Sequence, residues 1–255
     1  MIFDTHAHYD DERFDEDRDT LLKQLHHEGI SYILNACASP QSIEKCLELA
    51  AAYDFVYTAL GIHPHDADKM NEDIIDKIRT LADKPKVVAI GEIGLDYYYD
   101  NSPRETQKYW FERQIELAKE LKLPIIIHDR DAHEDTIKIL KKTDVKQVGG
   151  IFHCFAGSAE MALDMLKLNM YIGIGGAVTF KNARKTVEVV KAVPLDKLLV
   201  ETDCPYLSPE PFRGKRNNSG YLVYIIRKIA EIKGVSESVV AETTLMNAKK
   251  VFGLK

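Results

Sequence analysis

The feature that most constrains the fold is a repeated alternation of short apolar runs with longer segments of helical periodicity. Eight such runs occur along the 255 residues, and they are rich in residues that favour β-strands. They lie at Ile2–Asp4, Tyr32–Leu34, Val56–Leu60, Val87–Ile90, Ile125–Ile127, Gly150–Phe152, Tyr171–Ile174 and Leu198–Val200. Strands that alternate with helices predict a parallel sheet, and eight continuously apolar strands favour a closed (β/α)8 TIM barrel. An open, doubly wound sheet is the structural alternative.

The segments between and after these runs are typical of outer helices. Apolar and small residues recur at helical spacing between Thr106 and Leu121, and two more helices are predicted at 221–233 and 236–252, separated by Gly234. No linker, low-complexity tract or block of like charges divides the chain. We therefore expect a single α/β domain that spans residues 1–255.

Composition limits the classes of function. A formal net charge of −6 does not suit a protein that coats nucleic acid through its whole surface, so any such contact is expected to be local. No apolar run approaches the roughly 20 residues that span a bilayer, and the first residues, Met1 to His6, lack the pattern of a signal peptide. We expect a cytoplasmic protein with no membrane contact and no obligate protein partner.

The cysteines fit reduced packing residues. Cys37, Cys46, Cys154 and Cys204 form no CxxC pair, which argues against a thiolate zinc site and against disulfides. Cys154 and Cys204 adjoin residues with metal-binding side chains. Strand alternation nevertheless predicts that each thiol points away from the side its neighbour faces.

Side chains that bind metals gather at the carboxyl ends of the predicted strands. They are His6 and His8 after the first run, His63 after the third, Glu92 after the fourth, His128 after the fifth, His153 after the sixth, and Asp203 after the eighth. In a parallel barrel these ends open on one face, so residues far apart in sequence converge there. Two histidines at spacing two, as in His6 and His8, point to the same side of a strand and can grip one ion.

This donor set predicts one or two divalent ions. Imidazole nitrogens with carboxylate oxygens suit zinc, manganese or magnesium, and a bridging carboxylate suits a pair of ions. A lone histidine in a loop is usually only hydrogen-bonded or solvated, and we assign no function to His26, His27 and His133 on that ground. The joint pattern is more specific, because chance would scatter such residues over both ends of the barrel.

Basic and aromatic residues follow the same strand ends. Arg213, Lys215 and Arg216 lie in the loop after the eighth run, where barrels often bind phosphate, and Arg130 follows His128. The alternative for the loop is a solvated cluster of charges. The tyrosines at 97–99 follow Glu92 and are expected either to stack on bases of a single strand or to pack in the core.

These motifs resemble the TatD family of metal-dependent deoxyribonucleases, a branch of the amidohydrolase superfamily. The resemblance runs the length of the chain. It is carried by the motifs at residues 4–8, 61–65, 91–96, 127–130, 153–158, 201–207 and 213–217. The chain departs from the family's usual pattern at Ala156, where Ser is common, and at Asn218-Ser219, where Glu-Pro is common.

The resemblance implies a set of metal ligands. These would be His6, His8, Glu92, His128, His153 and Asp203, each at the matching motif position. Many amidase members of the superfamily place a carbamylated lysine at the end of the fourth strand. Here Glu92 holds that place and supplies a carboxylate without modification.

The hypothesis for function is metal-assisted hydrolysis of phosphodiester bonds in DNA, with 3′–5′ exonuclease action on single strands or frayed ends. Asp203 is the candidate to orient the attacking water and take its proton, and Glu92 shares the catalytic role by holding the ions. The expected substrate-binding residues are His63, Arg130, Arg213, Lys215 and Arg216. One alternative is a small-molecule amidohydrolase that acts on a C–N bond with the same metal site, and another is a non-catalytic scaffold.

Overall fold

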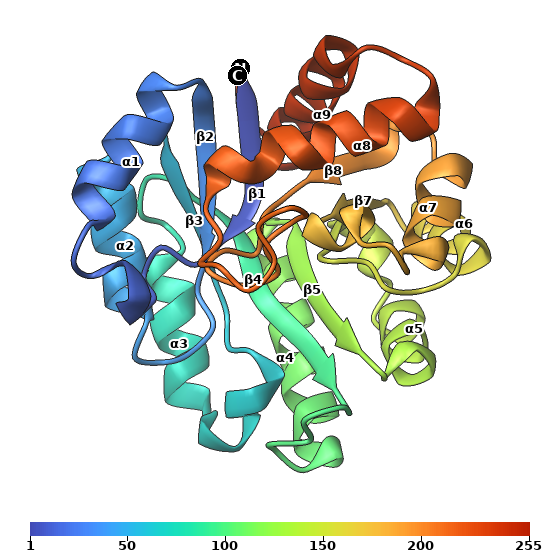
Figure 1. Ribbon diagram of the computed structural model, residues 1–255. Helices are drawn as coiled ribbons and strands as arrows, with labels where there is room; N and C mark the ends of the chain where they lie inside the picture. The colour runs from blue at the N-terminus through green and yellow to red at the C-terminus, as the bar shows by residue number, and fades with distance from the viewer.

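The computed structural model describes residues 1–255 as eight parallel strands surrounded by helices (Figure 1). The strands are β1 (Ile2–Ala7), β2 (Ile30–Ala36), β3 (Val56–Leu60), β4 (Val87–Asp96), β5 (Ile125–Arg130), β6 (Gly150–Phe152), β7 (Met170–Ile174) and β8 (Leu198–Val200). Each strand pairs in parallel with the next, in the order β1 to β8. The prediction of a TIM barrel is confirmed, and the open doubly wound sheet, which reverses strand order, is excluded.

The barrel is nearly closed between its first and last strands. Ala7 forms an isolated parallel bridge with Cys204. Asp203 donates its backbone N–H to the His6 carbonyl at 2.9 Å, and His8 donates to the Cys204 carbonyl at 2.8 Å. These bonds lie just beyond the end of β8, so the seam between β1 and β8 fixes the loop that carries Asp203 against the His6–His8 segment.

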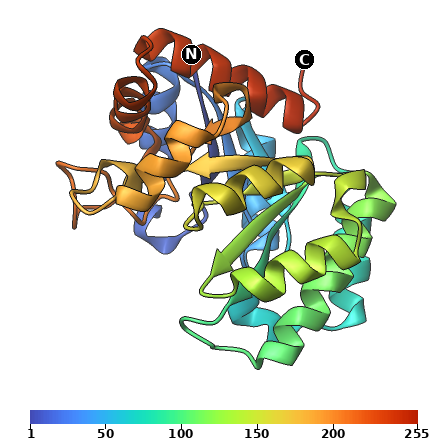
Figure 2. The ribbon, with the colours of Figure 1, turned by 90° about the vertical axis from the view of Figure 1, so that its right-hand side faces the viewer.

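Nine α-helices cover the outside of the barrel (Figures 1 and 2). They are α1 (Arg18–His27), α2 (Ile43–Ala52), α3 (Glu72–Leu81), α4 (Arg104–Leu121), α5 (His133–Lys142), α6 (Ala159–Lys167), α7 (Arg184–Ala192), α8 (Leu222–Lys233) and α9 (Glu237–Val251). Short 3-10 turns lie at Glu12–Phe14, Pro64–Lys69, Val145–Gln147, Gly176–Thr179, Leu195–Lys197 and Ser219–Tyr221. The three predicted helices are confirmed as α4, α8 and α9, and the side chain of Ser236 caps α9 by accepting from the N–H of Val239.

Two apolar cores account for this arrangement. The larger one fills the space between the strands and the outer helices. The smaller one fills the inside of the barrel with inward side chains from the strands, among them Leu34, Ile126 and Leu199, and includes Leu245 and Ala248 of α9. Helix α9 thus closes the amino-terminal end of the barrel, beside which both chain termini lie (Figures 1 and 2). The opposite end is left for function.

Some strands run further than their apolar residues. β4 extends to Asp96 and β5 to Arg130, because the backbone pairing continues through Gly94 with His128 and Asp96 with Arg130. The extra residues carry the polar side chains to the carboxyl end of the barrel. No helix of the structure has the length and apolar character that crossing a membrane requires.

Candidate metal centre

Strand alternation carries the functional side chains into the barrel. Ile126 and Ile151 point inward, so His128 and His153, two residues further along, point inward as well. The same rule places Glu201 inward, two residues after Leu199. The apolar interior therefore ends in a polar layer at the carboxyl end of the strands.

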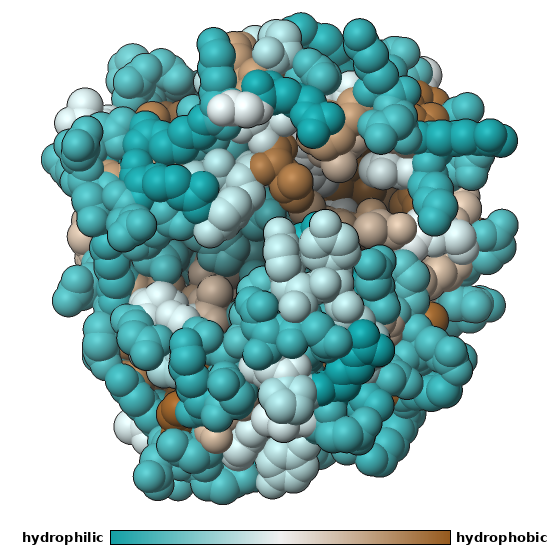
Figure 3. Space-filling model, turned by 60° about the horizontal axis from the view of Figure 1, so that its bottom comes forward, coloured by the Kyte–Doolittle hydropathy of each residue, from teal (hydrophilic) through white to brown (hydrophobic).

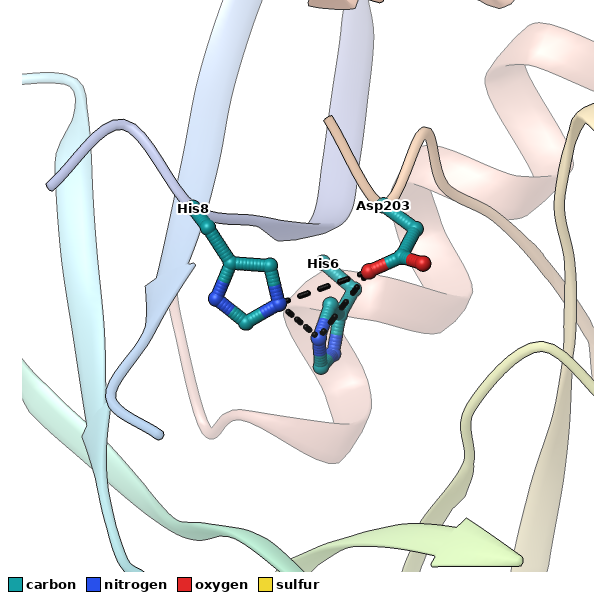
Figure 4. A group of neighbouring side chains, drawn as sticks. All are labelled: His6, His8 and Asp203. Carbon is teal, nitrogen blue, oxygen red and sulfur yellow. Dashed lines mark hydrogen bonds and ion pairs between the residues drawn. The ribbon is translucent and has the colours of Figure 1, made fainter. Parts of the chain in front are cut away.

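One group of metal-binding atoms is formed by His6, His8 and Asp203, whose side chains point toward one another (Figure 4). Nε2 of His6 lies 3.1 Å from Nε2 of His8. Oδ1 of Asp203 lies 3.4 Å from Nε2 of His8 and 3.9 Å from Nε2 of His6. Three donor atoms that meet at such distances can share one ion.

Glu92 joins this group to a second one. Its Oε2 lies 3.2 Å from Nε2 of His6, whereas its Oε1 lies 2.9 Å from Nδ1 of His128 and 3.7 Å from Nε2 of His63. Nε2 of His153 also lies 3.8 Å from Oε1. The two oxygens of one buried carboxylate thus face different histidines, which is the arrangement expected of a carboxylate between two ions.

The structure brings together all six predicted ligands and adds His63 to them. The ligand atoms lie within 4.8 Å of one another in each of three groups: His6, His8 and Asp203; His6, Glu92 and His153; and His63, Glu92 and His128. All the donors are nitrogen or oxygen, which suits zinc, manganese or magnesium. The residues present therefore fit one or two divalent ions.

In the metal-free protein, protonated histidines balance the negative charge of the buried carboxylates. Burial opposes the charged form of His8, but its hydrogen bond with Asp203 and the charges of Asp203 and Glu92 outweigh burial and raise its pKa to about 10. Carboxylates overcome burial in the same way at His128 and His153 and raise the pKa of each to about 9. Burial and neighbouring imidazolium charges lower the pKa of His6 and of His63.

The two carboxylates of the site are held in the ionised form. Burial favours the neutral acid of Glu92, but the charges of His6, His63 and His153 outweigh it and lower its pKa well below the usual range. Burial also favours the neutral acid of Asp203, but the charge of His153 and the hydrogen bond from His8 outweigh it and lower the pKa of Asp203. Both groups are therefore ready to bind a cation.

A further carboxylate, Glu201, supports His153 and was missed by sequence reasoning. Its Oε1 lies 3.1 Å from Nδ1 of His153 and accepts the Cys154 N–H at 2.5 Å, while its buried Oε2 has no hydrogen-bond partner. Gly173 leaves room for this carboxylate, because a Cβ there would lie 2.5 Å from Oε2. The sequence contains a signal for this residue, because strand alternation from Leu199 predicts that Glu201 points into the barrel.

Asp96 was also missed, and it supports His128. Its buried Oδ2 lies 3.1 Å from Nε2 of His128 and 2.8 Å from Nε2 of His65. Its Oδ1 accepts the backbone N–H groups of Tyr98 at 3.0 Å and Tyr99 at 2.8 Å. One carboxylate therefore ties a predicted metal ligand to the turn that follows β4.

The orientation predicted for Cys154 is wrong. Its sulfur lies within 4.8 Å of the ligand atoms of His153 and Glu201 instead of pointing away from them. Cys154 follows the end of β6 and has a φ of 42°, so the alternation rule no longer holds there. Burial raises the pKa of this thiol well above its usual value, which keeps it neutral. Cys204 is fully buried, as expected of a packing residue.

The metal-binding side chains other than His6 line a cavity of about 560 Å³, a size that suits a small ligand. Its walls include Asp10 and Asp11 after β1, Tyr99 after β4, Arg130 at the end of β5, and Tyr206 after β8. Figure 3 looks toward this end of the barrel and shows a mostly hydrophilic face that is hollowed between groups of side chains.

The predicted substrate-binding cations differ in their positions. Arg130 and His63 line the cavity, whereas Arg213, Lys215 and Arg216 do not. Arg213 stacks over Phe180 and Lys215 lies over Phe212, at 4.1 and 5.7 Å from the ring centres. Arg216 forms an ion pair with Asp17. A part for these three residues in phosphate binding stays a prediction.

Comparisons with known proteins agree with this site. The model of TatD-related DNases matches residues 3–253. An uncharacterized metal-dependent hydrolase from Bacillus subtilis (strain 168), YabD, is 49% identical over 252 residues, which cover 99% of each chain. A protein from Cronobacter sakazakii named 3′-5′ ssDNA/RNA exonuclease TatD is 33% identical over 258 residues, or 98% of this chain and 97% of that one.

Solved structures show the same likeness. The crystal structure of YJJV, a TatD homolog from Escherichia coli K12, superposes with a TM-score of 0.93 at 31% identity and covers 100% of this chain and 98% of that one. Family, fold and donor set thus agree along the whole length. The chain belongs to the TatD-related DNase family and is a metal-dependent hydrolase of that family.

Proposed function

We propose that this protein hydrolyses phosphodiester bonds in single-stranded DNA, starting from the 3′ end. The observation that carries the proposal is the position of Glu92, whose two carboxylate oxygens face two different groups of ligands. Such a pair of sites suits the transfer of a phosphoryl group, because charge develops on both the attacking and the leaving oxygen. The relative from Cronobacter sakazakii named as an ssDNA/RNA exonuclease supports the choice of substrate.

The metal-holding residues would be His6, His8, Glu92, His128, His153 and Asp203, with His63 facing the same carboxylate as His128. When bound there, magnesium, manganese or zinc supplies Lewis acidity and the positive charge that a phosphodiester needs. Glu201 and Asp96 would orient two of the imidazoles from behind, through the ring nitrogens that face away from Asp203 and Glu92.

Asp203 is the residue proposed to orient the attacking water and accept its proton. Its Oδ1 is near three histidines of the site. The side chain is 15% exposed, whereas that of Glu92 is only 4% exposed. Both carboxylates line the cavity, and Asp203 is the more accessible of the two to a water there. Its lowered pKa keeps it in the basic form.

Arg130 is proposed to bind a phosphate of the strand, since it lines the cavity and its guanidinium offers paired donors. His63 is proposed to contact the substrate phosphate as well as to face Glu92. The loop cations Arg213, Lys215 and Arg216 would act on a longer stretch of the strand, outside the cavity.

The test is cleavage of a single strand by protein of defined metal content. Purified protein is stripped with a chelator, reloaded with magnesium, manganese or zinc, and mixed with a 5′-labelled oligonucleotide. Successive shortening from the 3′ end is expected, and the Glu92→Gln variant should show none. Hydrolysis of cyclic amides without cleavage of DNA under any of these ions would instead establish the amidohydrolase alternative.

A further inference from the structure

The cavity has two unlike walls, which come from opposite sides of the barrel. Tyr99 and Arg130 belong to the β4–β5 side, whereas Asp10, Asp11 and Tyr206 follow β1 and β8, which lie opposite in the strand order. A single strand that crosses the metal centre has phosphates on the 5′ side of the cut bond, whereas its 3′ end has only a hydroxyl group. The charges of the two walls therefore distinguish the two directions in which the strand can lie.

Tyr98 and Tyr99 surround the one cation of the first wall. The guanidinium of Arg130 lies 4.0 Å from the ring centre of Tyr98 and 4.7 Å from that of Tyr99. Both rings remain open to solvent, with 58% and 54% of each residue exposed. Exposed aromatic faces beside an arginine are the usual means of binding a base and its phosphate without sequence preference.

Hydrogen bonds to Asp96 and Asp135 fix the turn that carries these rings. Asp96 accepts the N–H groups of Tyr98 and Tyr99 and also contacts His128. The hydroxyl of Tyr97 donates to Asp135 at 2.8 Å, and Arg104 lies 4.2 Å from its ring centre. Tyr97 is therefore an anchor, while the two exposed rings are free to contact a ligand.

The opposite wall suits the end of a strand. The amide of Asn35 donates to Asp10 at 2.9 Å, and Arg13 and Tyr206 donate to Asp11. Arg13 is paired with Asp11, so its charge is not free for a phosphate, whereas Arg130 forms no ion pair. Carboxylates accept a hydrogen bond from a 3′-hydroxyl and repel a phosphate in the same place.

We infer that the base on the 5′ side of the cut bond stacks on Tyr98 and Tyr99, with Arg130 on its phosphate, and that the 3′-terminal nucleoside lies against Asp10, Asp11 and Tyr206. This inference rests on the proposed function and adds the strand's direction and the residues that read it. Arg130 and the two tyrosines then determine how tightly the incoming strand is held. Asp10, which accepts a hydrogen bond from Asn35 and forms no ion pair, selects against a 3′-phosphate.

The experiment removes single bases from the substrate. Oligonucleotides with an abasic site at the terminal or at the penultimate position are compared with the intact strand. The wild-type protein is compared with Tyr98→Ala/Tyr99→Ala, with Tyr98→Phe/Tyr99→Phe and with Tyr109→Ala. Tyr109 is a matched control, because it is 53% exposed on α4 and, unlike Tyr98 and Tyr99, does not stack on Arg130.

Loss of the penultimate base should lower kcat/KM of the wild type by about 5- to 150-fold, the range of one base–aromatic stack. The double alanine variant should have a lower kcat/KM on the intact strand, and loss of the penultimate base should lower it little further. The phenylalanine and Tyr109→Ala variants should behave like the wild type. Anisotropy of a labelled strand bound in the presence of a chelator should show the same order of affinities. Hydrolysis of bis(4-nitrophenyl) phosphate, which has no bases, reports whether the metal centre of each variant is intact.

Three results would overturn the inference alone. Wild-type protein that cuts DNA equally well with and without the penultimate base would exclude stacking there. If the effect of Tyr98→Ala/Tyr99→Ala were confined to the terminal base, the strand would lie in the opposite direction. Equal cleavage of strands that end in a 3′-phosphate and in a 3′-hydroxyl would show that the acidic wall does not select the strand's direction. Failure of the wild type to cut any strand would instead reject the proposed function, and this inference with it.

Discussion

Nδ1 of His153 lies 3.1 Å from Oε1 of Glu201, while Nε2 of the same ring faces Glu92 and Asp203. A carboxylate behind a metal-binding histidine fixes the orientation of its ring and makes the facing nitrogen a better donor. Glu201 is fully buried and forms no ion pair with a lysine or arginine, so its place in the fold is explained by its contact with His153.

We expect Glu201→Gln to weaken metal binding by about 10- to 100-fold, the usual effect of removing such a support. The amide preserves the size of the side chain and removes its charge. Metal titrations of stripped protein measure the affinity, and circular dichroism checks the fold. Unchanged affinity would mean that Glu201 only fills space beside His153.

Gly173→Ala tests the same contact from the other side. The added methyl group would lie 2.5 Å from Oε2 and 2.7 Å from Oε1 of Glu201, so the carboxylate must move away. We expect metal affinity to fall by about tenfold or more, as for loss of Glu201 itself. In the double variant with Glu201→Gln the two losses should not add, because both remove one interaction. Additive losses would show that Gly173 acts through another contact.

Much of the fold could be predicted because both faces of each strand are buried, which leaves a continuous apolar run in the sequence. The ends of β4 and β5 could not. Their last residues are polar and are held by pairing between the two strands, and such pairing leaves no mark in composition. Asp96 was overlooked for this reason. It lies six positions beyond Ile90, where the predicted strand ended.

The metal ligands could be predicted because each directly follows a strand, whereas the loop cations have partners that sequence does not reveal. Arg216 pairs with Asp17, which is 199 residues away. The sequence could not reveal that its guanidinium pairs with this carboxylate at the start of α1. Arg130 differs, because β5 itself carries it to the cavity.

Asp203→Asn should lower turnover by about 10²- to 10⁴-fold, the usual contribution of a general base. The amide cannot accept the proton of the attacking water, but its oxygen remains beside His6 and His8. The fold and most of the metal content should therefore persist. Steady-state kinetics and metal analysis of the same samples measure both effects. Activity close to that of the wild type would remove Asp203 as the base.

Arg213→Ala/Lys215→Ala should raise KM by roughly two- to fivefold for each charge removed, the size of an exposed ion pair, and leave kcat unchanged. The effect should fall with added salt and be larger for long strands than for dinucleotides, since neither side chain lines the cavity. An unchanged KM on long strands would exclude the loop from phosphate binding. Lys181→Ala, a change of one exposed lysine after the 3-10 turn at Gly176–Thr179, provides a comparison for the effect per charge removed.

Binding of metal should release protons. The pKa of His8 is raised to about 10 and those of His128 and His153 to about 9, so all three carry a proton at pH 7 in the metal-free protein. A divalent ion binds only neutral imidazole, and these protons must leave as it enters. Calorimetry in buffers of different ionisation enthalpy counts them. Apparent affinity should rise with pH until about pH 10, where release ends.

The same pKa values predict opposite pH responses for the two forms of the protein. In the metal-free form, a raised histidine pKa gives stability that is complete below the unfolded value of 6.5 and is lost as pH rises through about 9 to 10. Its Tm should therefore fall between pH 8 and pH 10. The metal-loaded form holds neutral imidazoles and should keep its Tm over that interval. A metal-free Tm that stays level across it would show that the carboxylates of the site are not balanced by imidazolium charge.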